Sequence, residues 1–141
     1  MKRIVLNFVV FFALTGILAS CGQKKAAVSQ LAGKWTVASV KGEKLDMMKT
    51  PFFEFDLNEN RVYGNAGCNN FNSSLILDEK DASAVKFTMA ATTMMACPDM
   101  DKERVVLMAF GEIAFVKNGQ KEGEILLTDS NGTTIFQLVK D

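Results

Sequence analysis

The chain has 141 residues, with 16 basic side chains, 16 acidic side chains and no histidine. Balanced charge without a cluster of lysine and arginine argues against nucleic-acid binding. The absence of histidine removes the commonest general base near neutral pH and the commonest metal ligand. We therefore expect a protein that is not an enzyme and needs no cofactor or metal.

The N-terminal segment has the order of a bacterial lipoprotein signal. A basic start at Lys2 and Arg3 precedes an apolar run over residues 4–16, and small residues then lead to Cys21. The run is shorter than the roughly 17 to 25 residues that a membrane-spanning helix needs. We expect residues 1–20 to be a lipoprotein signal peptide, with an ordinary secretory signal or a short span as the alternative. The lipidated Cys21 would then anchor the protein to the membrane.

The residues that follow Cys21 indicate where in the cell the protein is located. Gly22 rather than aspartate follows Cys21, which favours the outer membrane, and the basic Lys24-Lys25 pair lacks the acidic run of some surface-exported lipoproteins. The predicted location is the cell envelope, on the outer membrane and facing the periplasm. Residues 21–30 are mostly small or polar, so they predict a lipidated N-terminus and a flexible tether. The folded domain is expected over residues 31–141.

Short strands are expected in the first half of this domain. Phe53, Phe55 and Leu57 alternate with acidic residues, which is the pattern of a strand with one buried face. Polar turn residues separate the other apolar segments. The expected strands are residues 33–40, 53–57, 61–64, 75–77 and 85–89.

The periodicity changes after Pro98. Val106, Phe110 and Ile113 recur at helical spacing, and Pro98 suits the first turn of such a helix. Gly111 is either a weak point inside the helix or its early end. Further strands are expected at residues 115–116, 125–128 and 133–139, the last two joined by a tight Asn-Gly turn.

These elements predict a mainly β protein of the α+β class. We expect a single antiparallel sheet or half-barrel of about seven to eight strands, covered by one amphipathic helix.

Cys68 and Cys97 remain once Cys21 is assigned to the lipid. An even pair outside the cytoplasm suggests a disulfide, with two buried free thiols as the alternative. A bridge across about 30 residues would contribute roughly 3.6 kcal/mol in the chain-entropy model.

Two segments around these cysteines carry a family resemblance. Residues 64–71 have the sequence GNAGCNNF, and residues 93–98 have the sequence TMMACP. With the lipoprotein signal, they resemble the META domain, the family of HslJ-like heat-shock lipoproteins, over about residues 31–141. The resemblance implies a role in envelope stress or antibiotic tolerance. The motif residues, with a structural or a binding role, are Gly64, Gly67, Asn69, Phe71, Thr93, Met95 and Pro98.

Each motif residue type suggests a local role. Gly64 and Gly67 permit a positive φ or a close backbone approach, and Asn69 is expected to hydrogen-bond its own turn. We interpret the acidic side chains as solvent-facing or turn residues rather than catalytic groups. The acids considered are Glu54, Asp56, Asp78 and Glu103.

Methionine is frequent for a domain of this size. We interpret these residues first as core packing, since methionine fills irregular gaps, and second as the lining of a groove for a lipid or peptide. Soft-metal binding by thioethers is a third, weaker possibility. Phe52 is the candidate for an exposed apolar contact. The methionines concerned are Met47, Met48, Met89, Met94, Met95, Met100 and Met108.

The expected function is that of a non-enzymatic envelope lipoprotein that binds or stabilises another envelope component. The alternatives are a carrier or receptor of a small apolar ligand and an inhibitor of an extracellular hydrolase. The expected partners are the membrane, through lipidated Cys21, and either an unidentified envelope protein or a small apolar ligand.

Overall fold

The computed structural model describes residues 26–141. The predicted signal peptide, residues 1–20, and the predicted lipidation site Cys21 lie outside the described residues. No helix within residues 26–141 is long and apolar enough to cross a membrane.

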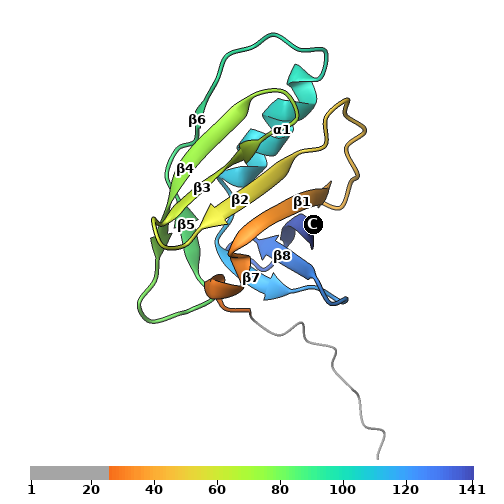
Figure 1. Cartoon of the computed structure of the whole chain (residues 1–141). Helices are drawn as coiled ribbons and strands as arrows, with labels where there is room; N and C mark the ends of the chain where they lie inside the picture. Colours follow the sequence, from red (N-terminus) through yellow and green to blue (C-terminus); the bar gives the residue numbers. More distant parts are fainter. Residues whose placement is uncertain (1–25) are drawn as a thin grey trace, which may run out of the picture.

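One antiparallel sheet forms the body of the domain (Figure 1). Its strands are β1 (Gly33–Val40), β2 (Phe52–Asp56), β3 (Arg61–Asn65), β4 (Asn70–Leu77), β5 (Val85–Phe87), β6 (Ala91–Thr92), β7 (Phe115–Asn118), β8 (Glu124–Thr128) and β9 (Thr134–Lys140). Their order across the sheet is β5-β4-β3-β2-β1-β9-β8-β7, and β6 pairs with β4 beside this path. A short 3-10 helix, η1 (Val28–Leu31), precedes the sheet, and α1 (Met100–Phe110) lies between β6 and β7 in the chain.

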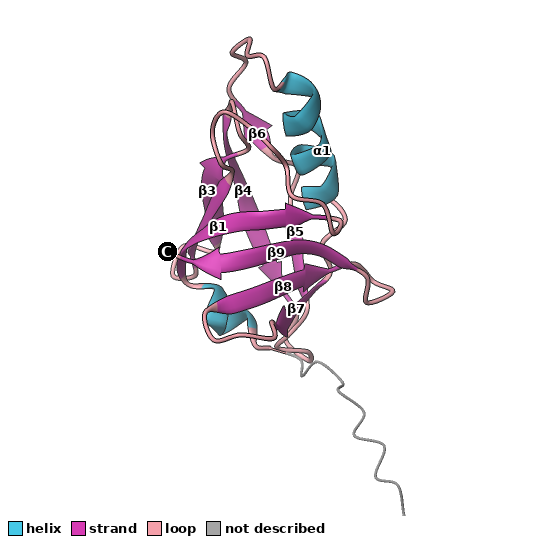
Figure 2. Cartoon of the chain, turned by 90° about the vertical axis from the view of Figure 1, so that its right-hand side faces the viewer, coloured by secondary structure: helices cyan, strands magenta, loops and turns pink. Residues whose placement is uncertain are grey.

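The two ends of the sheet nearly meet, which makes the sheet a half-barrel (Figure 2). The Val85 amide donates to the Ala114 carbonyl at 3.0 Å, and the Val116 amide donates to the Ser83 carbonyl at 2.8 Å. These bonds cover part of the edges that an open sheet would expose. The predicted fold class, a single antiparallel half-barrel with one helix, is confirmed.

The core centres on Phe53 of β2, which is fully buried. Its ring meets the rings of Phe55, Phe71, Phe110 and Phe136 edge-on, with centroid separations of 5.1 to 6.4 Å. Edge-to-face pairs contribute about 0.5 to 1.5 kcal/mol each beyond their buried area. Because these rings come from the sheet and from α1, Phe53 joins the helix to the half-barrel.

The helix differs from the prediction at both ends. It begins at Met100, so Pro98 precedes the N-cap residue Asp99 instead of lying in the first turn, where its fixed φ still suits the approach to a helix. It ends at Phe110 with Gly111 as its C-cap, which confirms the early end. Ile113 is buried, but it lies beyond the helix.

The prediction of a tether up to residue 30 is wrong for residues 26–30. Ala26 and Val28 are buried, and their amides donate to the carbonyls of Val116 and Ala82 at 3.2 and 2.8 Å. Both side chains belong to the hydrophobic core, and Val28 is the first residue of η1. The segment was too short and too mixed in polarity to show a periodic pattern.

The strand prediction missed the first part of β4. The structure starts this strand at Asn70 rather than Leu75, and Phe71, Ser73 and Leu75 alternate as its buried face. The polar residues between them obscured the alternation. The two-residue strand β6 was not predicted, and β5 ends at Phe87 rather than at residue 89.

We predict that Gly64→Ala will lower the free energy of unfolding by more than about 2 kcal/mol, because overpacking costs this much when the neighbour is rigid. A Cβ at residue 64 would lie 2.1 Å from the Phe52 carbonyl oxygen, which is backbone. Urea unfolding followed by circular dichroism measures the change. Gly111→Ala is the control: its backbone is helical and its nearest atom lies at 3.5 Å, so stability should stay equal or rise slightly. Equal losses in both variants would contradict the prediction.

Candidate functional site

The two motif segments meet at one end of the half-barrel. Cys68, in the turn between β3 and β4, forms a disulfide with Cys97, in the loop before α1, as predicted. The two Cα atoms are 6.1 Å apart, across 29 residues of sequence. The bridge fixes the end of the loop that runs from β5 through β6 to α1. This loop, residues 88–99, is named here the β5–α1 loop.

Asn65 holds the turn between β3 and β4. Its amide nitrogen donates to the Cys68 carbonyl at 3.0 Å, and its amide oxygen accepts from the Gly67 amide at 2.8 Å. Gly67 has a φ of 115°, a value that side chains disfavour. The prediction that Asn69 bonds its own turn is confirmed by one contact, from its side-chain nitrogen to Cys68 Sγ at 3.5 Å. Asn65 nevertheless makes the bonds that close the turn, and most bonds of the Asn69 side chain go to other segments.

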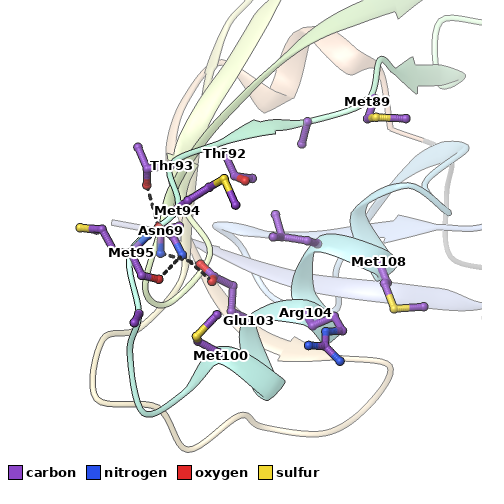
Figure 3. A pocket seen from close by; sticks show the side chains of 13 residues that line it. Asn69, Met89, Thr92, Thr93, Met94, Met95, Met100, Glu103, Arg104 and Met108 are labelled. Atoms are coloured by element: carbon purple, nitrogen blue, oxygen red, sulfur yellow. Dashed lines mark hydrogen bonds between the residues drawn. The ribbon is translucent and has the colours of Figure 1, made fainter.

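Asn69 connects the β5–α1 loop to the helix. Its side-chain oxygen accepts from the Met95 amide at 2.6 Å and from the Thr93 hydroxyl at 2.8 Å. Its side-chain nitrogen donates to Glu103 Oε2 at 2.8 Å and to the Met95 carbonyl at 3.2 Å. Three segments that are distant in sequence thus meet at one asparagine (Figure 3).

Glu103 is the buried charge of this network. It is 5% exposed, and its Oε1 accepts from the Asn69 backbone amide while Oε2 accepts from the Asn69 side chain. Our interpretation of Glu103 as a solvent-facing acid is wrong. Glu103 lies three residues before Val106 and seven before Phe110, so the helical spacing itself placed Glu103 on the buried face.

An open groove of about 550 Å³ lies beside this network, between the β5–α1 loop and the outer side of α1 (Figure 3). Its lining is mostly apolar. Besides Asn69, Thr93 and Glu103, the groove is lined by Met89, Ala90, Thr92, Met94, Met95, Ala96, Met100, Arg104, Leu107 and Met108.

The methionines of the groove are exposed rather than buried. Met89 and Met94 are 95% and 96% exposed. Met95, Met100 and Met108 are also exposed. The core-packing interpretation is wrong for these residues, since aromatic and branched side chains already fill the core. The second interpretation, the lining of a groove, agrees with the structure.

The third interpretation of the methionines, soft-metal binding, concerns the positions of their thioethers. Figure 3 shows them distributed around the groove rather than directed at one point. Within residues 26–141, no three or more histidine, cysteine, aspartate or glutamate side chains are grouped so that they could hold a metal ion.

Phe52 is not the exposed apolar contact that we expected. It is half-buried, and the Lys34 ammonium lies 4.6 Å from the centre of its ring. Met89 and Met94 of the β5–α1 loop are far more exposed apolar side chains than Phe52.

The start of α1 is attached to a second loop. The Asp99 carboxylate accepts from the Met48 amide at 2.8 Å and forms an ion pair with Lys102 at 3.3 Å. The Met48 hydrogen bond, helped by Lys102, lowers the pKa of Asp99 below its usual value. The loop before β2 is thereby attached to the helix that borders the groove.

The motif residues thus separate into two groups. Asn69, Thr93 and Met95 form the polar network at the groove. The other four have structural roles. Gly64 leaves room for the Phe52 backbone, and Gly67 has a positive φ. Phe71 packs on Phe53, and Pro98 precedes α1. Asn65 and Glu103 were not predicted as site residues, although Asn65 belongs to the first motif segment and Glu103 lies on the helix that follows the second.

We predict that replacing both Cys68 and Cys97 with alanine will lower the free energy of unfolding by roughly 2 to 4 kcal/mol, because the unfolded chain regains the entropy of an open loop. Chemical unfolding of the variant and of the oxidised protein provides the comparison. Amide hydrogen exchange at Met95 should also become faster, since the bridge holds its loop. Unchanged stability together with unchanged exchange would show that the bridge does not hold the loop.

We predict that Glu103→Gln will cost roughly 1 to 3 kcal/mol of unfolding free energy, because the new NH₂ group would face the donor nitrogen of Asn69. Glu112→Gln is the matched control. Its carboxylate forms a surface ion pair with Lys41 and is 44% exposed, so we expect a change within about 0.5 kcal/mol. Urea unfolding of both variants tests the difference, and a loss below 0.5 kcal/mol for Glu103→Gln would disprove the role assigned to it.

Comparisons with known proteins agree with this fold. The structure is similar to the NMR structure of a protein from Burkholderia xenovorans, with a TM-score of 0.66 and 17% identity over 100% of this chain and 99% of that chain. It is also similar to the crystal structure of a DUF4847 family protein from Bacteroides vulgatus, with a TM-score of 0.54 and 14% identity over 79% of this chain and 94% of that chain. No curated protein matches the sequence. The META domain family matches residues 29–141, and the chain therefore belongs to the META domain family.

Proposed function

We propose that this protein is a membrane-anchored envelope lipoprotein whose META domain binds an apolar envelope component in the methionine-lined groove. The observation that carries the proposal is the set of five methionines exposed around one groove. Contiguous exposed apolar surface on a soluble domain is typical of an interaction site. Methionine suits this role because its flexible thioether adapts to partners of different shape.

The anchor and the location are part of the same proposal. Residues 1–20 would be the signal peptide and Cys21 the lipidated residue, on the outer membrane and facing the periplasm. The Cys68–Cys97 disulfide supports an oxidising compartment. A role in envelope stress or antibiotic tolerance is what membership of the family suggests.

The groove favours binding over catalysis. Both oxygens of Glu103, the carboxylate in the groove, accept hydrogen bonds from Asn69, and Cys68 and Cys97 are joined to each other. The chain contains no histidine to activate a nucleophile. These features support a binding domain.

A carrier of a small apolar ligand is the second candidate. Its support is the size of the groove, since about 550 Å³ falls within the range of roughly 300 to 1,000 Å³ that small-molecule sites occupy.

In the native envelope, a photoreactive side chain at position 94 should crosslink to a specific envelope component. The same side chain at position 48 is the matched control, because Met48 is 84% exposed but does not line the groove. Each is placed in the full chain, with and without Cys21→Ala, and products are identified by mass spectrometry. We expect Cys21→Ala to release the protein from the membrane fraction and to reduce the crosslink.

Two results would contradict the proposal in different ways. Equal crosslinking at positions 94 and 48 would mean that the groove is not the binding surface. Retention in the membrane fraction of a Cys21→Ala variant that has lost residues 1–20 would mean that Cys21 is not the anchor.

A further inference from the structure

We infer that the groove binds a single-chain anionic amphiphile, such as a long-chain fatty acid. Its alkyl chain would lie against the methionine thioethers, and its anionic head would pair with Arg104. The inference rests on the proposed function, because it names the ligand chemistry of the same groove.

The two walls of the groove provide contacts for an alkyl chain. Met89 and Met94 project from the β5–α1 loop on one side, and Leu107 and Met108 belong to α1 on the other. An alkyl chain is apolar and has no fixed shape, which matches a surface of flexible thioethers. Burial of each methylene contributes about 0.8 kcal/mol. A groove of about 550 Å³ is suited to a single alkyl chain and not to the surface of a bilayer.

The charges of the groove select the head group. Of the two charged side chains that line it, Glu103 is buried and its carboxylate is already held by Asn69. The Arg104 side chain is exposed, and its guanidinium has no hydrogen bond or ion pair with any of residues 26–141. A guanidinium offers paired N–H donors that match a carboxylate or a phosphate. The available charge in the groove is therefore positive, which favours an anionic ligand.

The position of the groove in the domain favours binding of an amphiphile that is a monomer in solution over binding of one that is inserted in the membrane. The chain enters the described domain at Ala26, and α1 begins at the opposite end in both views (Figures 1 and 2). Ala26 follows the proposed anchor Cys21 by five positions in the sequence. The groove thus lies in the half of the domain opposite Ala26, the described residue that is nearest in sequence to the proposed anchor, and there it would meet a monomeric amphiphile.

Methionine methyl NMR tests the inference directly. The full chain with Cys21→Ala and ¹³C-methyl methionine is titrated with dodecanoate below its micelle concentration. We expect saturable shifts at Met89, Met94 and Met108 and none at Met48, which serves as the internal control. Dodecyl phosphate and dodecyltrimethylammonium, which have the same chain, compare a second anionic head with a cationic one. Tighter binding of either anion than of the cation supports the inference, and the stronger of the two identifies the head group.

Variants at exposed positions separate the contribution of the ligand's anionic head group to binding from that of its alkyl chain. Arg104→Gln should weaken dodecanoate binding roughly twofold to fivefold, as expected for an exposed ion pair, without weakening binding of the cation. The double variant Met89→Gln and Met94→Gln should weaken binding of both amphiphiles, whereas Met48→Gln should change neither. All four residues are exposed, so folding is not at risk, and unfolding curves check this.

Equal affinity for the anions and the cation, or no effect of Arg104→Gln, would overturn the inference. If no amphiphile shifts the groove methionines while a protein crosslinks at position 94 in the envelope, the inference fails and the proposed function stands. If both experiments are negative, both proposals fail.

Discussion

The contact between Glu103 of α1 and Asn69 of the β3–β4 turn is the interaction on which the groove depends. A carboxylate that is 5% exposed would cost several kcal/mol if it lacked donors, and Asn69 supplies two of them. The same asparagine then binds Thr93 and Met95 with its oxygen. One buried polar contact thus sets the distance between the helix and the β5–α1 loop, and with it the width of the groove.

This arrangement lets a loop with little regular structure display apolar side chains. The β5–α1 loop contains one strand of two residues, so backbone pairing contributes little to its position. The Cys68–Cys97 disulfide and the Asn69 network hold it at its far end. The aromatic cluster around Phe53 meanwhile stabilises the half-barrel without any of the exposed methionines. Fold stability therefore does not depend on the groove methionines, which allows their part of the lining to be apolar and exposed.

Local sequence patterns predicted much of the fold. The alternation around Phe53 identified β2, because the period of a strand is visible whenever polar and apolar residues alternate. The same rule failed at Asn70–Ser74, where Ser73 occupies a buried position and hides the period. It also failed at residues 26–30, which are too few to show a period. The family resemblance singled out Gly64 and Gly67, and their residue type then suggested a positive φ or a close backbone approach.

The sequence by itself determined the class of the fold and the single α-helix, because these follow from periodicity and turn residues. It suggested the pairing of Cys68 with Cys97 only after Cys21 had been assigned to the lipid. Helical spacing also placed Glu103 on the buried face of α1, and only the tertiary structure decided that the methionines of the β5–α1 loop are exposed. Burial depends on which surfaces remain after the core is filled, and that core is made of rings contributed by β2, β4, β9 and α1. No local pattern in the loop contains this information, since a methionine is equally suited to a core and to a groove.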